Sequence, residues 1–239
     1  MFGLFGSKRQ SLLTGEIFAG AVDNHSHVLY GVDDGIKTLE DSLKVLDFME
    51  KAGVETLWLT PHIMEDVPNT SEDLKGRFAE LQAAYSGSIR LRLAAEYMLD
   101  TLYMERLRGR DLRLHGGDLV LVETSTWSPP IDLWDMLEET LKAGYRPLVA
   151  HPERYRYMGM NDYERLRKMG CQLQLNLPSI VGVYGEEPQA KAMQLLEKGW
   201  YCMFGTDCHR FRALEGQANA SVLKSDTITR LAGLKKGAE

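Results

Sequence analysis

Residues 118–123, Asp-Leu-Val-Leu-Val-Glu, place four consecutive apolar residues between two acidic ones. A short, continuous apolar run of this kind is typical of a strand that is buried on both faces of a parallel sheet. Glu123 follows at the carboxyl end of this predicted strand. The stretch therefore predicts a helix-covered parallel sheet that carries a charged side chain at its carboxyl edge.

Comparable strands alternate with amphipathic helices along most of the chain. In the helix that begins at Thr38, apolar residues share one face, and Gly53 ends the helix. Further helices are expected at 72–85, 99–108, 131–143, 162–169 and 189–198, before a terminal helix. The strands are expected at 20–24, 54–60, 89–95, 118–122, 147–150, 171–175 and 200–204.

This βα alternation predicts an α/β fold, namely a TIM-like barrel of about seven parallel strands with surrounding helices. An open doubly wound sheet is the alternative. The chain has 239 residues, of which 44% are apolar, and no linker-like or low-complexity run divides it. We therefore expect a single domain over residues 1–239, with residues 1–17 as a short N-terminal extension.

The net charge of the chain and its few cysteines indicate which partners and which cellular compartment to expect. A formal net charge of −6 argues against a broad contact with the phosphate backbone of nucleic acid. Cys171, Cys202 and Cys208 form a sparse and odd set, which suits a reducing compartment better than a disulfide framework. We expect a cytoplasmic protein.

The N-terminal residues do not resemble a targeting segment. They are apolar first and basic afterwards, which is the reverse of a signal peptide, and no run is long enough to cross a membrane. We expect Phe2, Leu4 and Phe5 to fray or to pack weakly on a surface.

Histidines and acids recur where the predicted strands end. Each alone would pass for an ordinary loop or helix-start residue. The carboxyl ends of parallel strands meet on one face of a barrel, so residues far apart in sequence converge there. These candidate ligands are His25 and His27 after the first strand, His62 after the second, Glu96 after the third, Glu123 after the fourth, His151 after the fifth, and Asp207 with His209 after the seventh.

The spacing and the residue types indicate a metal cluster. His25 and His27 alternate with Ser26, so both imidazoles point the same way from an extended segment. Asp33 and Asp34 return on the following loop, and only His115 stands outside the pattern. Histidine with carboxylate suits Zn²⁺, Mn²⁺ or Fe²⁺ better than Ca²⁺. Two or three close cations activate water and hold phosphoryl oxygens, which predicts hydrolysis of a phosphate ester.

These residues carry a family resemblance. The His-x-His opening, the Asp33-Asp34-Gly35 loop, Thr-Pro-His62, His151-Pro-Glu-Arg154 and Asp207-Cys-His209 resemble the polymerase and histidinol phosphatase (PHP) superfamily. More narrowly, they resemble its bacterial metal-dependent tyrosine-protein phosphatases. Those enzymes counter the autophosphorylated tyrosine kinases of capsule and exopolysaccharide export. The matches run in order from about residue 22 to 209.

The resemblance implies three divalent ions per chain, with Mn²⁺ favoured and Fe²⁺, Zn²⁺ or Mg²⁺ as alternatives. Arg154 matches the phosphate-binding arginine of the family. The second such arginine is absent from its usual place, and Arg210 or Arg212 would take its role. The implied ligand sets are His25, His27, Glu96 and Asp207 for the first ion, Glu96, Glu123 and His151 for the second, and Asp34, His62 and His209 for the third.

Aromatic residues stand beside several expected ligands. Tyr30, Tyr97 and Trp127 would either line a slot for a phenyl ring or pack in the interior. The expected substrate is a tyrosine-phosphorylated protein, namely a bacterial tyrosine kinase tail.

The sequence gives less support to other functions. A thiol phosphatase needs an arginine six positions after its nucleophilic cysteine, and none of the three cysteines has one. A histidinol-phosphate phosphatase or another PHP phosphoesterase would share nearly every ligand and stays open. A non-catalytic, metal-bound scaffold that grips the kinase is the alternative of another class.

Overall fold

The structure, a computed structural model, describes residues 9–237. The expectation for Phe2, Leu4 and Phe5 therefore lies outside the described residues, as does part of the predicted extension over residues 1–17.

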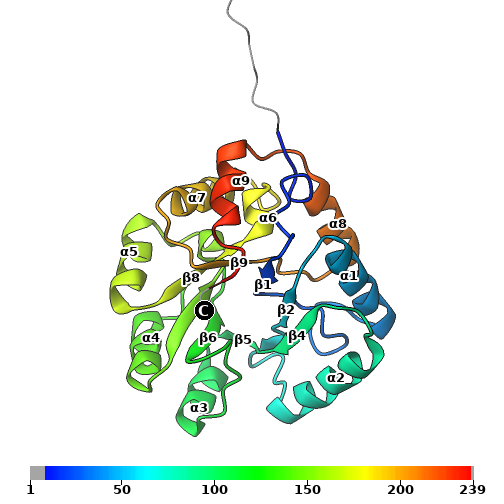
Figure 1. Cartoon of the computed structure of the whole chain (residues 1–239). Helices are drawn as coiled ribbons and strands as arrows, with labels where there is room; N and C mark the ends of the chain where they lie inside the picture. The colour runs from blue at the N-terminus through cyan, green and yellow to red at the C-terminus, as the bar shows by residue number, and fades with distance from the viewer. Residues whose placement is uncertain (1–8, 238–239) are drawn as a thin grey trace, which may run out of the picture.

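The strands are all parallel and lie at the centre of the molecule (Figure 1). One group has the order β1-β2-β4, with bounds Val22–Asp23, Thr56–Leu59 and Arg90–Leu93. The other has the order β3-β5-β6-β7-β8-β9, with bounds His62–Ile63, Glu96–Met98, Leu119–Glu123, Arg146–Ala150, Gln172–Asn176 and Met203–Gly205. The predicted parallel α/β fold is confirmed.

The two groups of strands together form one ring. Thr56 pairs with Arg90 and His62 with Glu96, so the register is unchanged where β2 gives way to β3 and β4 to β5. On the far side, His27 N donates to the Cys208 carbonyl at 3.0 Å, which joins the segment after β1 to the segment after β9. Seven chain segments therefore surround the centre at the carboxyl ends of the strands, as in a TIM-like barrel.

Residues 9–237 form nine strands instead of the seven predicted, because the short strands β3 and β5 follow the predicted strands at 54–60 and 89–95 after a break. Pro61 has no N–H to donate and separates β2 from β3. Ala94 and Ala95 separate β4 from β5. The strands were predicted to end at Thr60 and Ala95, and β3 and β5, which are only two and three residues long, were not predicted.

Helices cover the outside of the ring (Figure 1). The helix that was predicted to begin at Thr38 is α1, and Thr38 is its N-cap, since its side chain accepts a hydrogen bond from Asp41 N. The short α6 was not predicted, and the terminal helix is in fact two helices. The bounds are α1 Leu39–Lys51, α2 Ser71–Ala84, α3 Thr101–Gly109, α4 Leu133–Lys142, η1 Pro152–Arg154, α5 Met160–Met169, α6 Leu177–Ile180, α7 Glu186–Glu197, α8 Phe211–Asn219 and α9 Ser225–Ala232. None of the helices among the described residues is long and apolar enough to span a membrane.

Candidate metal centre

The two histidines after β1 point to one position inside the ring. His25 and His27 are fully buried, and their Nε2 atoms lie 3.1 Å apart. Asp207, from the segment after β9, places Oδ1 at 3.6 Å from His25 Nε2 and at 3.4 Å from His27 Nε2. Atoms that bind one ion at about 2.1 Å lie about 3.0–3.5 Å from each other, so this spacing suits a shared cation.

Glu96 lies at the centre of the cluster. Its side chain is fully buried at the start of β5. Oε2 is 3.1 Å from His25 Nε2 and 3.2 Å from His27 Nε2, whereas Oε1 faces the other way, 3.0 Å from His151 Nε2. One carboxylate thus reaches two groups of imidazoles.

Neighbouring strands supply the next donors. His62 Nδ1, at the start of β3, is 3.2 Å from Glu96 Oε2 and 3.1 Å from Glu123 Oε1 at the end of β6. His151 Nε2 is 3.7 Å from Glu123 Oε2. His62 therefore lies between the second and third ligand sets that the family resemblance implies.

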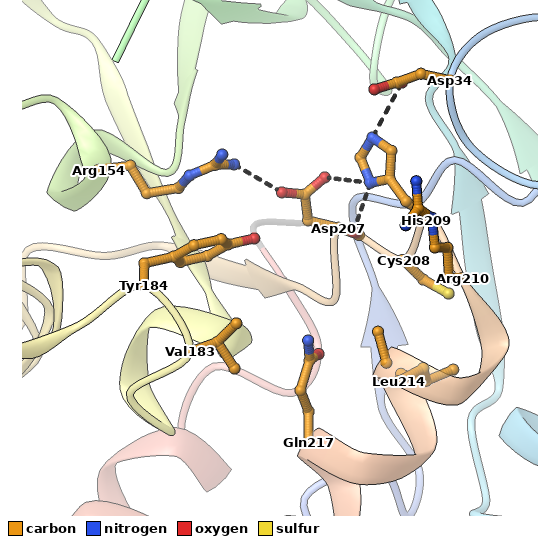
Figure 2. Close-up of a pocket in the computed structure, with 11 residues that line it drawn as sticks. Asp34, Arg154, Val183, Tyr184, Asp207, Cys208, His209, Arg210, Leu214 and Gln217 are labelled. Carbon is orange, nitrogen blue, oxygen red and sulfur yellow. Dashed lines mark hydrogen bonds and ion pairs between the residues drawn. The ribbon is translucent and has the colours of Figure 1, made fainter. Parts of the chain in front are cut away.

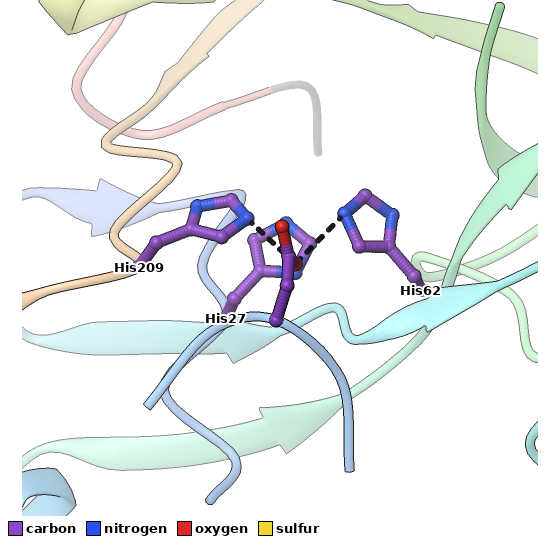
Figure 3. A group of neighbouring side chains, drawn as sticks. His27, His62 and His209 are labelled. Carbon is purple, nitrogen blue, oxygen red and sulfur yellow. Dashed lines mark ion pairs between the residues drawn. The ribbon is translucent and has the colours of Figure 1, made fainter. Parts of the chain in front are cut away.

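A third group lies nearest to solvent. Figure 3 shows the rings of His27, His62 and His209 gathered around one carboxylate side chain. Asp34 Oδ1 is 3.5 Å from His62 Nε2 and 3.3 Å from His209 Nε2. The Asp34 side chain is 73% exposed, so this donor is far less enclosed than Glu96. All nine predicted ligands thus meet in one cluster.

The hydrogen bonding of this cluster fits divalent ions. Glu96 Oε2 and His62 Nδ1 are buried, lie 3.2 Å from each other, and have no partner with hydrogen-bond geometry among the described residues. Buried polar atoms without partners are costly, and a cation would satisfy the donor atoms that converge here. Four overlapping groups of these side chains have donor atoms close enough to hold an ion.

The backbone is strained at two of the nine positions. His151 has φ 36° and Asp207 has φ 50°, which is the left-handed region that side chains other than glycine rarely adopt. Such strain persists where the surrounding structure holds the residue in place for a function. Here it turns each side chain inward at the end of its strand.

Burial and charge act against each other in the metal-free cluster. Burial alone would lower the pKa of His25, but the charges of Glu96 and Asp207 raise it to about 9. Burial alone would raise the pKa of Glu96, yet the surrounding histidines hold it well below its usual range. In the absence of metal, His25 is therefore protonated at neutral pH.

Three side chains orient the expected ligands from behind. Asp33 Oδ2 lies 2.8 Å from His27 Nδ1, so the neighbour that the sequence suggested is an orienting group. Gln174 Oε1 lies 3.1 Å from His25 Nδ1, and Asn176 Nδ2 donates to Asp207 Oδ2 at 2.9 Å. Sequence analysis missed Gln174 and Asn176, although the alternation of polar and apolar residues in β8 marks them as facing inward.

A cavity of about 360 Å³ opens beside the cluster (Figure 2). Arg154 and His209 approach Asp207 from opposite sides, and Arg154 Nη1 donates to Asp207 Oδ2 at 3.0 Å. The Arg154 guanidinium also stacks on the ring of Tyr184, at 4.4 Å from its centroid. Tyr184, which the sequence did not single out, lies on the loop between α6 and α7.

The two alternative arginines occupy different positions. Arg210 lines the cavity beside the cluster, together with Arg154 and Asp34. Arg212 lines a separate cavity with Ile36 and Phe211, in which Arg210 also takes part. The first cavity thus presents Arg210, but not Arg212, next to the expected ligands.

The aromatic residues expected near the mouth lie elsewhere. Tyr97 is fully buried and its hydroxyl accepts a hydrogen bond from Arg113 N, so it packs in the interior. Tyr30 donates to Glu80 on α2, and Trp127 is exposed beneath Arg156. None of the three lines the cavity beside the cluster.

The cysteines lack nucleophilic character. Burial raises the pKa of Cys171 to about 12 and that of Cys202 to about 11. Cys208 lies between two expected ligands, and burial raises its pKa further still. All three are free thiols that stay protonated near neutral pH.

The chain is similar in sequence to one protein family and to curated relatives. A family model described as capsular polysaccharide synthesis, CpsB/CapC, matches residues 21–223. The tyrosine-protein phosphatase CpsB of Streptococcus agalactiae serotype V is 32% identical over 176 residues, which cover 67% of this chain and 69% of the relative. The protein of the same name from Streptococcus pneumoniae is 27% identical over 233 residues, covering 91% and 93% of the two chains.

A solved structure shares the fold. Its description reads "Crystal structures of YwqE from Bacillus subtilis and CpsB from Streptococcus pneumoniae, unique metal-dependent tyrosine phosphatases". It aligns with a TM-score of 0.75 at 21% identity and covers 88% of this chain and 85% of its own.

Proposed function

The chain belongs to the CpsB/CapC family of capsular polysaccharide synthesis, and on that premise we propose that it is a metal-dependent protein-tyrosine phosphatase. The observation that carries the proposal is the convergence of nine histidine and carboxylate side chains beside Arg154. The relatives named tyrosine-protein phosphatase support the same activity.

The ions and the arginines of the proposed site have different roles in catalysis. Divalent ions supply activation of a water and neutralisation of charge on phosphoryl oxygens. Arg154 carries a guanidinium that suits the non-bridging oxygens of a phosphoryl group, since it donates two parallel hydrogen bonds. Arg210 reaches the same cavity and takes the role of the second arginine, in preference to Arg212.

We propose three ions, with Mn²⁺ as the favoured metal and Glu96 as the shared bridge. His25, His27 and Asp207 would hold the innermost ion with Glu96, whose second oxygen lies 3.0 Å from His151. His151 and Glu123, which are 3.7 Å apart, would hold the second ion with Glu96. Asp34, His62 and His209 would hold the outer ion. His27 is close enough to the outer group to share in it.

The cavity beside the cluster suits a phenyl phosphate. Val183 and Leu214 give the cavity an apolar part, whereas Arg154, Asp34 and His209 line it with polar groups. Tyr184 forms the aromatic part of the mouth, in place of the residues that the sequence suggested. We expect the phenyl arm of a phosphotyrosine to bring its phosphate to these polar groups.

The partner, location and extent of the domain follow the family resemblance. We propose an autophosphorylated bacterial tyrosine kinase of capsule export as the substrate. A cytoplasmic location fits the three free cysteines. Residues 1–239 are proposed to act as a single PHP-type domain.

Chelation separates this proposal from a thiol mechanism. Removal of divalent ions should abolish hydrolysis of a phosphotyrosine peptide, and added Mn²⁺ should restore it. Cys208→Ser should keep most of the rate, because the thiol is buried and protonated. Loss of activity on thiol alkylation without loss on chelation would reject the proposal.

A further inference from the structure

A second cavity lies at the opposite end of the ring from the metal cluster. It measures about 500 Å³ and takes its lining from the amino halves of β1, β2, β4, β6 and β7. It exists because β6 pairs with β5 only from Leu121 onward. Within residues 9–237, no strand pairs with Leu119 or Val120 on the side of β4.

The residues that face this cavity from β4 are charged. Leu91 and Leu93 pack against the main core, and Arg90 and Arg92 point to the other face and line the cavity. Both arginines are exposed. Inward positions of a barrel are normally filled by branched apolar residues, as Leu119, Leu121 and Leu148 do in the adjoining small core cluster. Packing of the barrel interior therefore does not explain why Arg90 and Arg92 occupy these positions.

The charges in this cavity are only partly balanced. Asp118 binds Arg146 through both carboxylate oxygens, at 2.6–2.9 Å, and Glu55 binds Lys236 at 2.7 Å. Arg90 and Arg92 have no carboxylate within ion-pair distance among the described residues. The cavity therefore presents two guanidinium groups without a carboxylate partner, side by side on one strand.

An aromatic pair borders the two arginines. Trp58 pairs with Arg92 across β2 and β4, and its ring lies 5.5 Å from the guanidinium carbon. His115 stacks on Trp58 at 4.2 Å, and its Nε2 lies 2.7 Å from the Asn24 carbonyl. Burial lowers the pKa of His115 to about 4, so this ring adds no charge at neutral pH. The outlying histidine of the sequence is thus part of this cavity.

We propose that this cavity binds the phosphate or pyrophosphate group of a small molecule, at a site separate from the metal cluster. The guanidinium fork matches phosphate oxygens, and two forks on one strand match a group with several such oxygens. The volume of about 500 Å³ leaves room beside Trp58 for an organic part. Free pyrophosphate and a nucleoside diphosphate share this chemistry.

Calorimetric titration of the full chain with pyrophosphate tests the proposal. Metal is first removed so that the probe cannot bind ions, and Arg154→Ala removes the anion site at the cluster. Circular dichroism verifies that the protein stays folded. We expect saturable one-to-one binding that weakens at least tenfold in Arg90→Gln/Arg92→Gln. Arg165→Gln/Arg167→Gln, on α5, removes the same charge from exposed positions and should bind as the parent does.

Two further probes locate and identify the ligand. The indole N–H resonance of Trp58, assigned with Trp58→Phe, should shift on binding. Adenosine diphosphate that binds more tightly than pyrophosphate indicates an organic ligand, and equal affinity indicates the free anion. Absent binding, equal binding in the Arg90→Gln/Arg92→Gln variant, or adenosine that binds as well as its diphosphate would each overturn the proposal.

Discussion

Glu96 Oε1 lies 3.0 Å from His151 Nε2, and the other oxygen of the same carboxylate faces the imidazoles of His25, His27 and His62 at 3.1–3.2 Å. No other carboxylate in the cluster lies within ion-pair distance of as many imidazoles. Glu96 is therefore the group on which the proposed ions most depend.

Glu96→Gln should lose more metal than Asp34→Asn. Replacing one carboxylate oxygen of Glu96 removes an anionic donor that two groups of imidazoles share, whereas Asp34 contacts only His62 and His209. We expect a loss of more than one equivalent for Glu96→Gln and of at most one for Asp34→Asn. Elemental analysis of the purified proteins gives both values, and equal contents would contradict the bridging role.

Arg154→Ala should lower kcat/KM for a phosphotyrosine peptide by about 10²–10³, the usual effect of removing one charged donor to a transition state. Its metal content should stay unchanged, because the arginine contacts Asp207 Oδ2 and not the oxygen that faces the histidines. Tyr184→Leu removes the ring that supports this guanidinium and should raise KM more than it lowers kcat.

The other two arginines provide a matched comparison. Arg210→Ala should weaken product inhibition by phosphate, because Arg210 lines the cavity beside the cluster. Arg212→Ala removes the same charge two residues away, from a different cavity, and should leave this inhibition unchanged. The reverse result would assign the second phosphate contact to Arg212.

Metal affinity should rise with pH. The pKa of His25 is raised to about 9 in the metal-free protein and that of His27 is also raised, so both imidazoles carry protons at neutral pH. Because only neutral imidazole binds a metal, an ion must displace these protons, and its affinity increases until the pH passes the folded-state pKa. Calorimetry in buffers of different ionisation enthalpy counts the released protons. An affinity that does not change between about pH 6.5 and 8.5 would contradict this assignment.

The sequence predicted the metal ligands best where the fold brings residues that are distant in sequence together. Parallel strands bring their carboxyl ends together, so eight of the nine ligands, from His25 to His209, could be predicted from the strand ends. Asp34 lies on the loop after the first strand, and only the family resemblance chose it over Asp33. The short strands β3 and β5 were missed because two or three residues are too few to show an alternating pattern.

Other parts of the site had no periodic signal. Tyr184 lies on a loop, and its stacking on Arg154 depends on how α6 and α7 place that loop. Tyr97 has the same aromatic character and adjoins Glu96 in sequence, but strand alternation turns it away from the centre into the core. Sequence neighbours of a ligand therefore do not identify the substrate pocket.

The most direct test of the proposed activity is a comparison of kcat/KM for three substrates with the Mn²⁺-loaded enzyme. A tyrosine-phosphorylated peptide from a kinase tail, the matched phosphoserine peptide and histidinol phosphate are measured under identical conditions. The account predicts that the phosphotyrosine peptide is hydrolysed best, because we expect its longer arm to bring the phosphate to Arg154 and His209, which line the cavity. Histidinol phosphate as the best substrate would contradict it and assign a biosynthetic phosphatase instead.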